Sequence, residues 1–171
     1  MDKYVELAKN TIEKFITHGE TYEPSDDELT DEMKERRAGA FVSIHEKGQL
    51  RGCIGTIAPT CKNIAYEIIS NAIAASTRDP RFEPIRTEEL DSLEINVDIL
   101  RPEEPIASPA QLDVNRYGVI VEKGFKRGLL LPDLDGVDSV EEQIAIAKRK
   151  AGIDPNEGGV KMYRFEVVRH V

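Results

Sequence analysis

The chain carries two spacings of apolar residues, one typical of helices and one typical of strands. Apolar side chains recur every three or four positions in residues 2–17, which predicts an amphipathic helix. Residues 61–76 are apolar over a wider arc, and this pattern predicts a helix that is largely buried. A third helix is predicted to begin at Ser139, where Glu142 completes a capping box, and to continue to about residue 151.

Alternation of apolar and polar residues, the spacing typical of strands, is clearest in residues 93–100. The polar segment 20–37 and the proline-containing segment 101–113 are predicted to be irregular connections. Strands joined by hairpins and interspersed with helices predict an α+β fold, with a mainly antiparallel sheet flanked by helices. The six predicted strands are residues 38–45, 50–57, 93–100, 119–121, 128–131 and 160–169.

Composition adds limits on the class of protein. A length of 171 residues suits a single domain, or a main body with a second smaller lobe. The net charge of −9 disfavours non-specific nucleic-acid binding. Neither a signal peptide nor an apolar run of membrane-spanning length is present, so a cytoplasmic protein with no membrane span is predicted, and its two cysteines are expected to be reduced.

The segment 50–56, Leu-Arg-Gly-Cys-Ile-Gly-Thr, combines a thiol, a guanidinium and two glycines. In a regular strand Arg51 and Cys53 would lie on the same face, about 7 Å apart. A nearby guanidinium favours the thiolate form that a nucleophilic or redox cysteine needs. Gly52 and Gly55 would allow a ligand to approach, with Thr56 beside them. The alternative is structural: a buried thiol, an ion-paired arginine and glycines at a close packing point.

His45 is the candidate base for Cys53, and the register of the first hairpin decides whether it can act. A two-residue turn at Lys47-Gly48 would pair His45 with Leu50, on the face opposite Cys53. A shift or bulge of one residue would bring His45 to the Cys53 side and place Ser43 beside Cys53. Both registers are compatible with the sequence.

The proline-containing loop after the second helix offers Asp79 and Arg81 as a charged wall for a pocket at the hairpin. The same two residues could simply form an ion pair that holds the turn. The spacing of the cysteines and histidines does not fit a zinc site, and no glycine-rich nucleotide motif is present. The sequence therefore predicts no metal and no cofactor.

Four stretches resemble the AMMECR-one domain family, whose prokaryotic stand-alone members are called AmmeMemoRadiSam system protein A. They are residues 39–44, 50–56, 79–82, and 117–121 together with 127–132. The resemblance covers most of the chain from about residue 38 onward. It implies one AMMECR-one-type domain over residues 1–171, built of a larger and a smaller lobe. It also implies that segment 50–56 is the family's signature motif, and that a Memo-like protein and a radical-SAM protein are possible partners.

The family brings no settled activity, so three hypotheses follow. In the first, a pocket at the hairpin binds a small molecule or peptide, Cys53 is the nucleophile or redox thiol, and Arg51 stabilises its anion. Asp79 and Arg81 would then form the pocket wall, in a modification pathway alongside a radical-SAM enzyme. In the second, the chain is a non-catalytic adaptor for the Memo-like or radical-SAM partner. The third, a nucleic-acid-linked regulatory role, is disfavoured by the negative charge.

Overall fold

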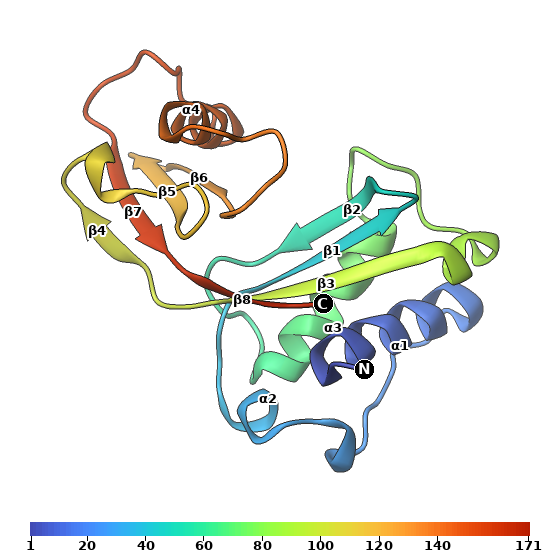
Figure 1. Cartoon of the computed structure of the whole chain (residues 1–171). Coiled ribbons are helices and arrows are strands. Elements are labelled where there is room, and N and C mark those ends of the chain that lie inside the picture. The colour runs from blue at the N-terminus through green and yellow to red at the C-terminus, as the bar shows by residue number, and fades with distance from the viewer. The chain divides into compact units, whose positions relative to one another are not determined.

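The structure, a computed structural model, describes residues 1–171 and divides them into two compact units. Unit 1 contains residues 1–100 and 168–171, and unit 2 contains residues 101–167. The chain holds two four-stranded sheets together with helices (Figure 1). Its strand pairs are antiparallel. The predicted α+β class is confirmed, although its strands form two sheets rather than one.

The sheet of unit 1 has the strand order β2-β1-β3-β8. Its strands are β1 (Ala40–Glu46), β2 (Gln49–Gly55), β3 (Leu93–Leu100) and β8 (Val167–His170). Helices α1 (Lys3–His18) and α3 (Ile64–Thr77) lie together on one face of this sheet (Figure 1). Val42 and Ile44 point into the core that these helices cover, so residues 41, 43 and 45 lie on the opposite face, called here the outer face.

Local side-chain contacts set the ends of the two long helices. The Asp2 side chain accepts hydrogen bonds at the start of α1, and Gly19 ends the helix with a left-handed φ of 68°. The prediction that the second helix begins at Cys61 was wrong by three residues. Asn63 caps α3, and the residues before it form a loop whose backbone N–H groups bond to the buried Glu67 carboxylate. Short helical segments complete unit 1: Asp26–Glu28, α2 (Asp31–Glu35) and Thr87–Ser92.

Unit 2 has its own sheet, in the order β4-β7-β5-β6, and its own core. Its elements are β4 (Glu104–Ile106), a 3-10 turn (Pro109–Gln111), β5 (Gly118–Lys123), β6 (Lys126–Leu130), α4 (Val140–Ala151) and β7 (Lys161–Phe165). Segment 101–113 was predicted to be irregular throughout but contains β4. Pro105 is tolerated there because β4 is an edge strand, where a missing N–H leaves no ladder bond unmade.

Residues 160–169 were predicted as one closing strand, and this was wrong. The segment forms β7 in the sheet of unit 2 and then β8 in the sheet of unit 1. The apolar pattern cannot show this change of sheet because both strands continue the same extended run. None of the helices combines the length and the apolar character that crossing a membrane requires.

Candidate functional site

The first hairpin contains a β-bulge at Arg51. Its turn at Lys47-Gly48 pairs His45 with Leu50, yet Ser43 pairs with Cys53 and Ile44 with Gly52. One extra residue, Arg51, therefore lies in β2 between these two sets of pairs. Two features that the sequence left as alternatives, the two-residue turn and the Ser43–Cys53 pair, thus occur together. The regular alternation that would place Arg51 and Cys53 on one face is interrupted.

The Arg51 guanidinium is taken up by partners other than Cys53. Its Nε and Nη2 donate to the two Glu89 carboxylate oxygens at 2.8 and 3.1 Å. Nη1 donates to the Glu83 carbonyl at 2.7 Å, and Nη2 also reaches the Pro84 carbonyl. Only 18% of the Arg51 side chain and 11% of the Glu89 side chain are exposed. Arg51 therefore holds the loop after α3 against the bulge. It was predicted to stabilise the Cys53 anion, but in the structure its guanidinium is bonded to Glu89 and to the loop instead.

Cys53 lies on the outer face of the sheet, because its strand partner is Ser43. The Ser43 Oγ and Cys53 Sγ atoms are 3.3 Å apart, within hydrogen-bonding distance. Ser43 also pairs with Asn96 of β3, so a thiol, a hydroxyl and an amide lie in one row across three strands. Cys53 is half-buried. The row places a thiol next to two groups that can both donate and accept hydrogen bonds.

Asp79 is the buried carboxylate of this site. It accepts a hydrogen bond from the Cys53 backbone N–H at 3.0 Å and three more from Arg81. Only 2% of its side chain is exposed. The bonds from the Arg81 guanidinium, followed by those from the two backbone N–H groups, lower the pKa of Asp79 to about 2 against the cost of burial. Asp79 is therefore ionised at neutral pH and fixes both β2 and Arg81.

Arg81 is the guanidinium that the structure places beside Cys53. Its Nη2 donates to Asp79 at 2.8 Å and reaches the Cys53 carbonyl at 3.4 Å, while Nη1 has no protein partner. Its side chain remains 56% exposed, and its guanidinium lies over the Phe82 ring. The pKa of Arg81 is raised, mainly by the Asp79 carboxylate and also by the charge of Cys53. Arg81 is thus held at one end and open to solvent at the other.

The two glycines of the motif serve close packing. A Cβ on Gly52 would lie 2.2 Å from the Ala75 carbonyl oxygen of α3, and a Cβ on Gly55 would lie 2.2 Å from the Phe41 ring. Gly52 allows β2 to contact the helix, and Gly55 allows the Phe41 ring to lie against the strand. The sequence left ligand approach and close packing as alternatives for both glycines, and in the structure protein atoms occupy the space beside them.

Thr56, also predicted to bind ligand, belongs to a buried polar network. Its hydroxyl donates to the Glu67 carboxylate at 2.8 Å and accepts a bond from the Asn71 amide. Glu67 is fully buried, and burial alone would raise its pKa. Hydrogen bonds from the loop before α3 and from Thr56 outweigh that effect and lower the pKa. Glu67 and Glu89 were not predicted to take part, because an acidic residue at a helical spacing gives no sign of burial.

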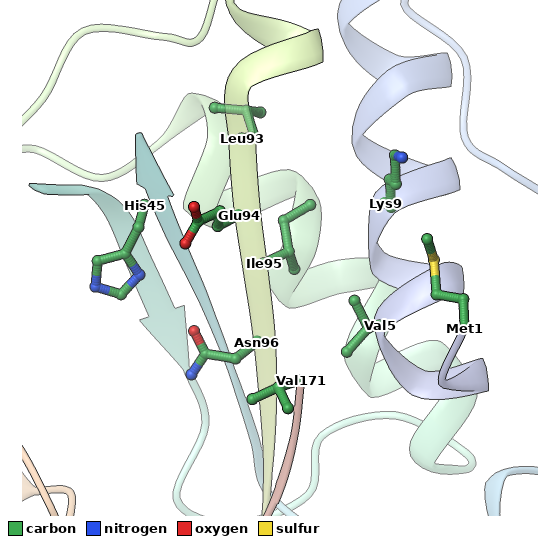
Figure 2. A pocket seen from close by; sticks show the side chains of 9 residues that line it. All are labelled: Met1, Val5, Lys9, His45, Leu93, Glu94, Ile95, Asn96 and Val171. Carbon is green, nitrogen blue, oxygen red and sulfur yellow. The ribbon is translucent and has the colours of Figure 1, made fainter. Parts of the chain in front are cut away.

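His45 is not bonded to Cys53. It pairs with Leu50 on one side and Glu94 on the other, two pairs along from the Ser43 row and on the same outer face. It lines a pocket at the edge of β3 together with Glu94 and Asn96 (Figure 2). No three His, Cys, Asp or Glu side chains of the chain come together as a potential metal site. The residues brought together around Cys53 are therefore Ser43, Asp79 and Arg81.

The two-sheet α+β fold and the Arg-Gly-Cys-Ile-Gly bulge define a recognisable class of protein. The chain matches the AMMECR1 family over residues 5–170, and it belongs to that family. A protein of Thermotoga maritima is 53% identical over 98% of this chain and 96% of its own length. A Clostridium acetobutylicum protein is 47% identical over 99% of this chain, which spans only 36% of that longer protein.

A solved structure has the same fold. The crystal structure of uncharacterized protein PH0010 from Pyrococcus horikoshii superposes with a TM-score of 0.90 and 34% sequence identity, covering 97% of this chain and 88% of that one. This likeness supports the two-sheet fold and the family assignment.

Proposed function

We propose that the outer face around Cys53 is a thiol-dependent site that binds a small molecule or peptide carrying an anionic group. One observation supports this most directly: the Arg81 guanidinium lies beside Cys53, is fixed by a buried carboxylate, and remains more than half exposed. A purely structural ion pair between two neighbouring residues has no need of an exposed guanidinium end. Cys53 is the reacting group in this proposal, Arg81 binds the anion, and Asp79 is a positioning residue.

The roles follow from the electrostatics of the site. A cation close to a thiol stabilises the thiolate and lowers the cost of losing the proton. Arg81, rather than Arg51 as predicted from the sequence, is the cation proposed to stabilise the Cys53 thiolate. The Asp79 carboxylate bonds both to the Arg81 guanidinium and to the Cys53 backbone N–H, so it fixes the cation next to Cys53, and its own charge is paired with that cation.

The chemical step is a nucleophilic attack. Cys53 Sγ gives its proton to solvent, and its electron pair forms a bond to an electrophilic carbon of the ligand. The group that leaves that carbon takes the electron pair of the bond that breaks. Ser43 Oγ, 3.3 Å from Sγ, can donate a hydrogen bond to the thiolate and orient it.

This site would act in the cytoplasm, within the modification pathway that the AmmeMemoRadiSam association suggests. A second candidate function, a non-catalytic adaptor for a Memo-like or radical-SAM partner, is supported by the Clostridium relative. There the matching region is only 36% of a longer protein, so the same fold occurs joined to further chain. A nucleic-acid-linked role ranks third because the net charge is −9.

The test compares an anionic and a neutral alkylating reagent of similar size, iodoacetate and iodoacetamide. Peptide mass spectrometry resolves Cys53 from Cys61, which serves as an internal control. We expect the iodoacetate-to-iodoacetamide rate ratio to be higher at Cys53 than at Cys61, and to fall in Arg81→Gln but not in Arg86→Gln, a matched change at an exposed arginine. Equal ratios at the two cysteines in the wild-type protein would rule out the anion-binding role of Arg81.

A catalytic role and an adaptor role are separated by a second experiment. Cys53→Ser should abolish turnover of any substrate found, yet leave co-purification with a Memo-like or radical-SAM partner unchanged. Activity retained in Cys53→Ser would remove the thiol mechanism. No complex with those partners at micromolar concentrations would count against the adaptor.

A further inference from the structure

Strand β3 extends beyond the strand that covers its outer edge. β3 has eight residues, and its neighbours in the sheet are β1 and the four-residue β8. The Arg101 N–H bonds to the Glu166 carbonyl, and the Arg169 guanidinium bonds to Asp98, so β8 runs along the second half of β3. Figure 1 shows β3 continuing past the end of β8. Within residues 1–171, the edge at residues 93–96 has no strand partner.

A groove of about 360 Å³ lies at this edge. Its floor and one wall come from Leu93–Asn96 of β3, and its other wall comes from Val5 and Lys9 of α1 (Figure 2). Met1 and Val171, both more than four-fifths exposed, complete the lining. The groove is thus bounded by a strand edge on one side and an amphipathic helix on the other.

The two sides of β3 at this edge differ in chemistry. Leu93 and Ile95 face the α1 side and pack against the core of unit 1. Glu94 and Asn96 alternate with them and lie with His45 on the other side (Figure 2). A strand laid beside β3 would therefore place every second side chain against apolar residues, and the side chains between them next to Glu94.

We propose that the edge of β3 at residues 93–96 binds an extended, basic peptide segment of a partner protein as an added strand. The free edge of an antiparallel strand offers alternating N–H and C=O groups, and the ligand that satisfies them is another extended backbone. The inward side chains of the segment are apolar and lie among Val5, Ile95 and Met1. An outward basic side chain lies opposite Glu94.

Charge selects this occupant over the alternatives. The protein carries a net charge of −9, and Glu94 is the charged residue on the outer side of the edge, so this side attracts a basic side chain. Lys9 lies on the α1 side, where the apolar side chains of the segment face. A second copy of this chain pairing through the same edge would bring two Glu94 carboxylates close together, and like charges across strands are unfavourable. The proposed peptide site contains neither Cys53 nor Arg81, so its test is independent of the test of the proposed thiol site.

The experiment uses the full chain and a synthetic peptide, acetyl-Ser-Val-Lys-Val-Lys-Val-Ser-amide, with binding followed by NMR. We expect saturable shifts of the backbone amides at residues 93–96 and slower hydrogen exchange there. Glu94→Lys should weaken binding by about fivefold or more, the value of one cross-strand charge pair. Glu88→Lys, a charge reversal at a residue that is exposed and outside the groove, should leave binding unchanged.

Two N-methylated peptides supply the sharpest control. In an extended strand the N–H groups of the valines point to one edge and those of the lysines to the other. One methylated set should therefore abolish binding and the other should preserve it. Equal binding by both sets would show apolar contact without strand addition and would overturn the proposal. No saturable binding at millimolar peptide, or a dimer of the chain that uses this edge, would overturn it as well.

Discussion

Arg51 and Arg81 each form an ion pair with a largely buried carboxylate, with a shortest N–O distance of 2.8 Å, yet the two regions differ in what remains available. Every nitrogen of the Arg51 guanidinium is hydrogen-bonded within the protein, and its side chain is 18% exposed. Arg81 is bonded through Nε and Nη2 only and is 56% exposed. The first pair holds the loop after α3 to the bulge in β2, whereas the second leaves a fixed cation exposed to solvent.

The two arginines therefore differ in function: one holds the structure together, and the other keeps a guanidinium available to solvent. The residue that the sequence emphasises, Arg51, holds the bulge and the loop together. Arg81, to which we assign anion binding, comes from a loop that is 28 positions away from Cys53. Gly52 stands between the two regions because it lets β2 contact α3 at this point. Changes at these residues should therefore separate stability from reactivity.

The largest effect is expected from Gly52→Ala. The added Cβ would lie 2.2 Å from a backbone oxygen of α3, so the strand or the helix has to move. We expect the free energy of unfolding to fall by about 3 kcal/mol, measured by urea titration. Gly158→Ala, where no atom lies within 4 Å of the added Cβ, is the control and should change it by less than about 0.5 kcal/mol. Equal stability of the two variants would contradict the close contact.

Arg51→Ala should lower the free energy of unfolding by about 2 kcal/mol, because Glu89 would be left buried without its cation. The exposed Arg86→Ala should cost less than about 0.5 kcal/mol. The alkylation rate of Cys53 in the folded Arg51→Ala protein should match the wild-type rate. A large loss of Cys53 reactivity in Arg51→Ala would return the anion-stabilising role to Arg51.

Acid should weaken both regions. Hydrogen bonds from Arg51 lower the pKa of Glu89 to about 2, and hydrogen bonds from Arg81 lower the pKa of Asp79 to about 2. Groups whose folded pKa is lowered stabilise the protein above their unfolded pKa, and this contribution is lost as the pH falls from about 5 to about 2. Asp79→Asn should remove about 2 kcal/mol of that pH dependence, measured by unfolding at several pH values. An unchanged pH dependence in this variant would contradict the pairing.

The smallest effect on stability is expected from Arg81→Gln, about 1 kcal/mol. Asp79 keeps its bonds from the backbone N–H groups of residues 53 and 81, and the glutamine amide can donate to it. The preference of Cys53 for iodoacetate should nevertheless disappear. Loss of stability as large as that of Arg51→Ala would mean that the two arginines play the same structural role.

Much of the fold was predictable from local pattern. The helix at residues 2–17, the first hairpin and the strand at 93–100 each follow from apolar spacing and turn residues, and the structure confirms them. The change of sheet between β7 and β8 was not predictable, because strand pairing depends on distant residues. The true start of α3 was also missed, since it depends on Glu67 bonding to a loop six or seven residues earlier.

The sequence named three of the residues that lie together in the structure, but it did not predict how they pair. Cys53, Asp79 and Arg81 were all selected from the sequence, and the structure brings them together. The assignment of Arg51 to the thiol failed because it assumed a regular strand. A bulge of one residue leaves no mark in composition, and the partner of Arg51, Glu89, lies 38 positions further along the chain.

The return of the chain to the first sheet has a consequence for the order of assembly on the ribosome. β3 emerges early, but β8, which supplies Arg169 to the buried Asp98, follows only after the whole of residues 101–167. At ordinary translation rates this interval is several seconds, long enough for unit 2 to fold by itself. Until residues 167–170 are added, the nascent first sheet therefore has three strands, and Asp98 lacks the arginine that it pairs with in the folded protein.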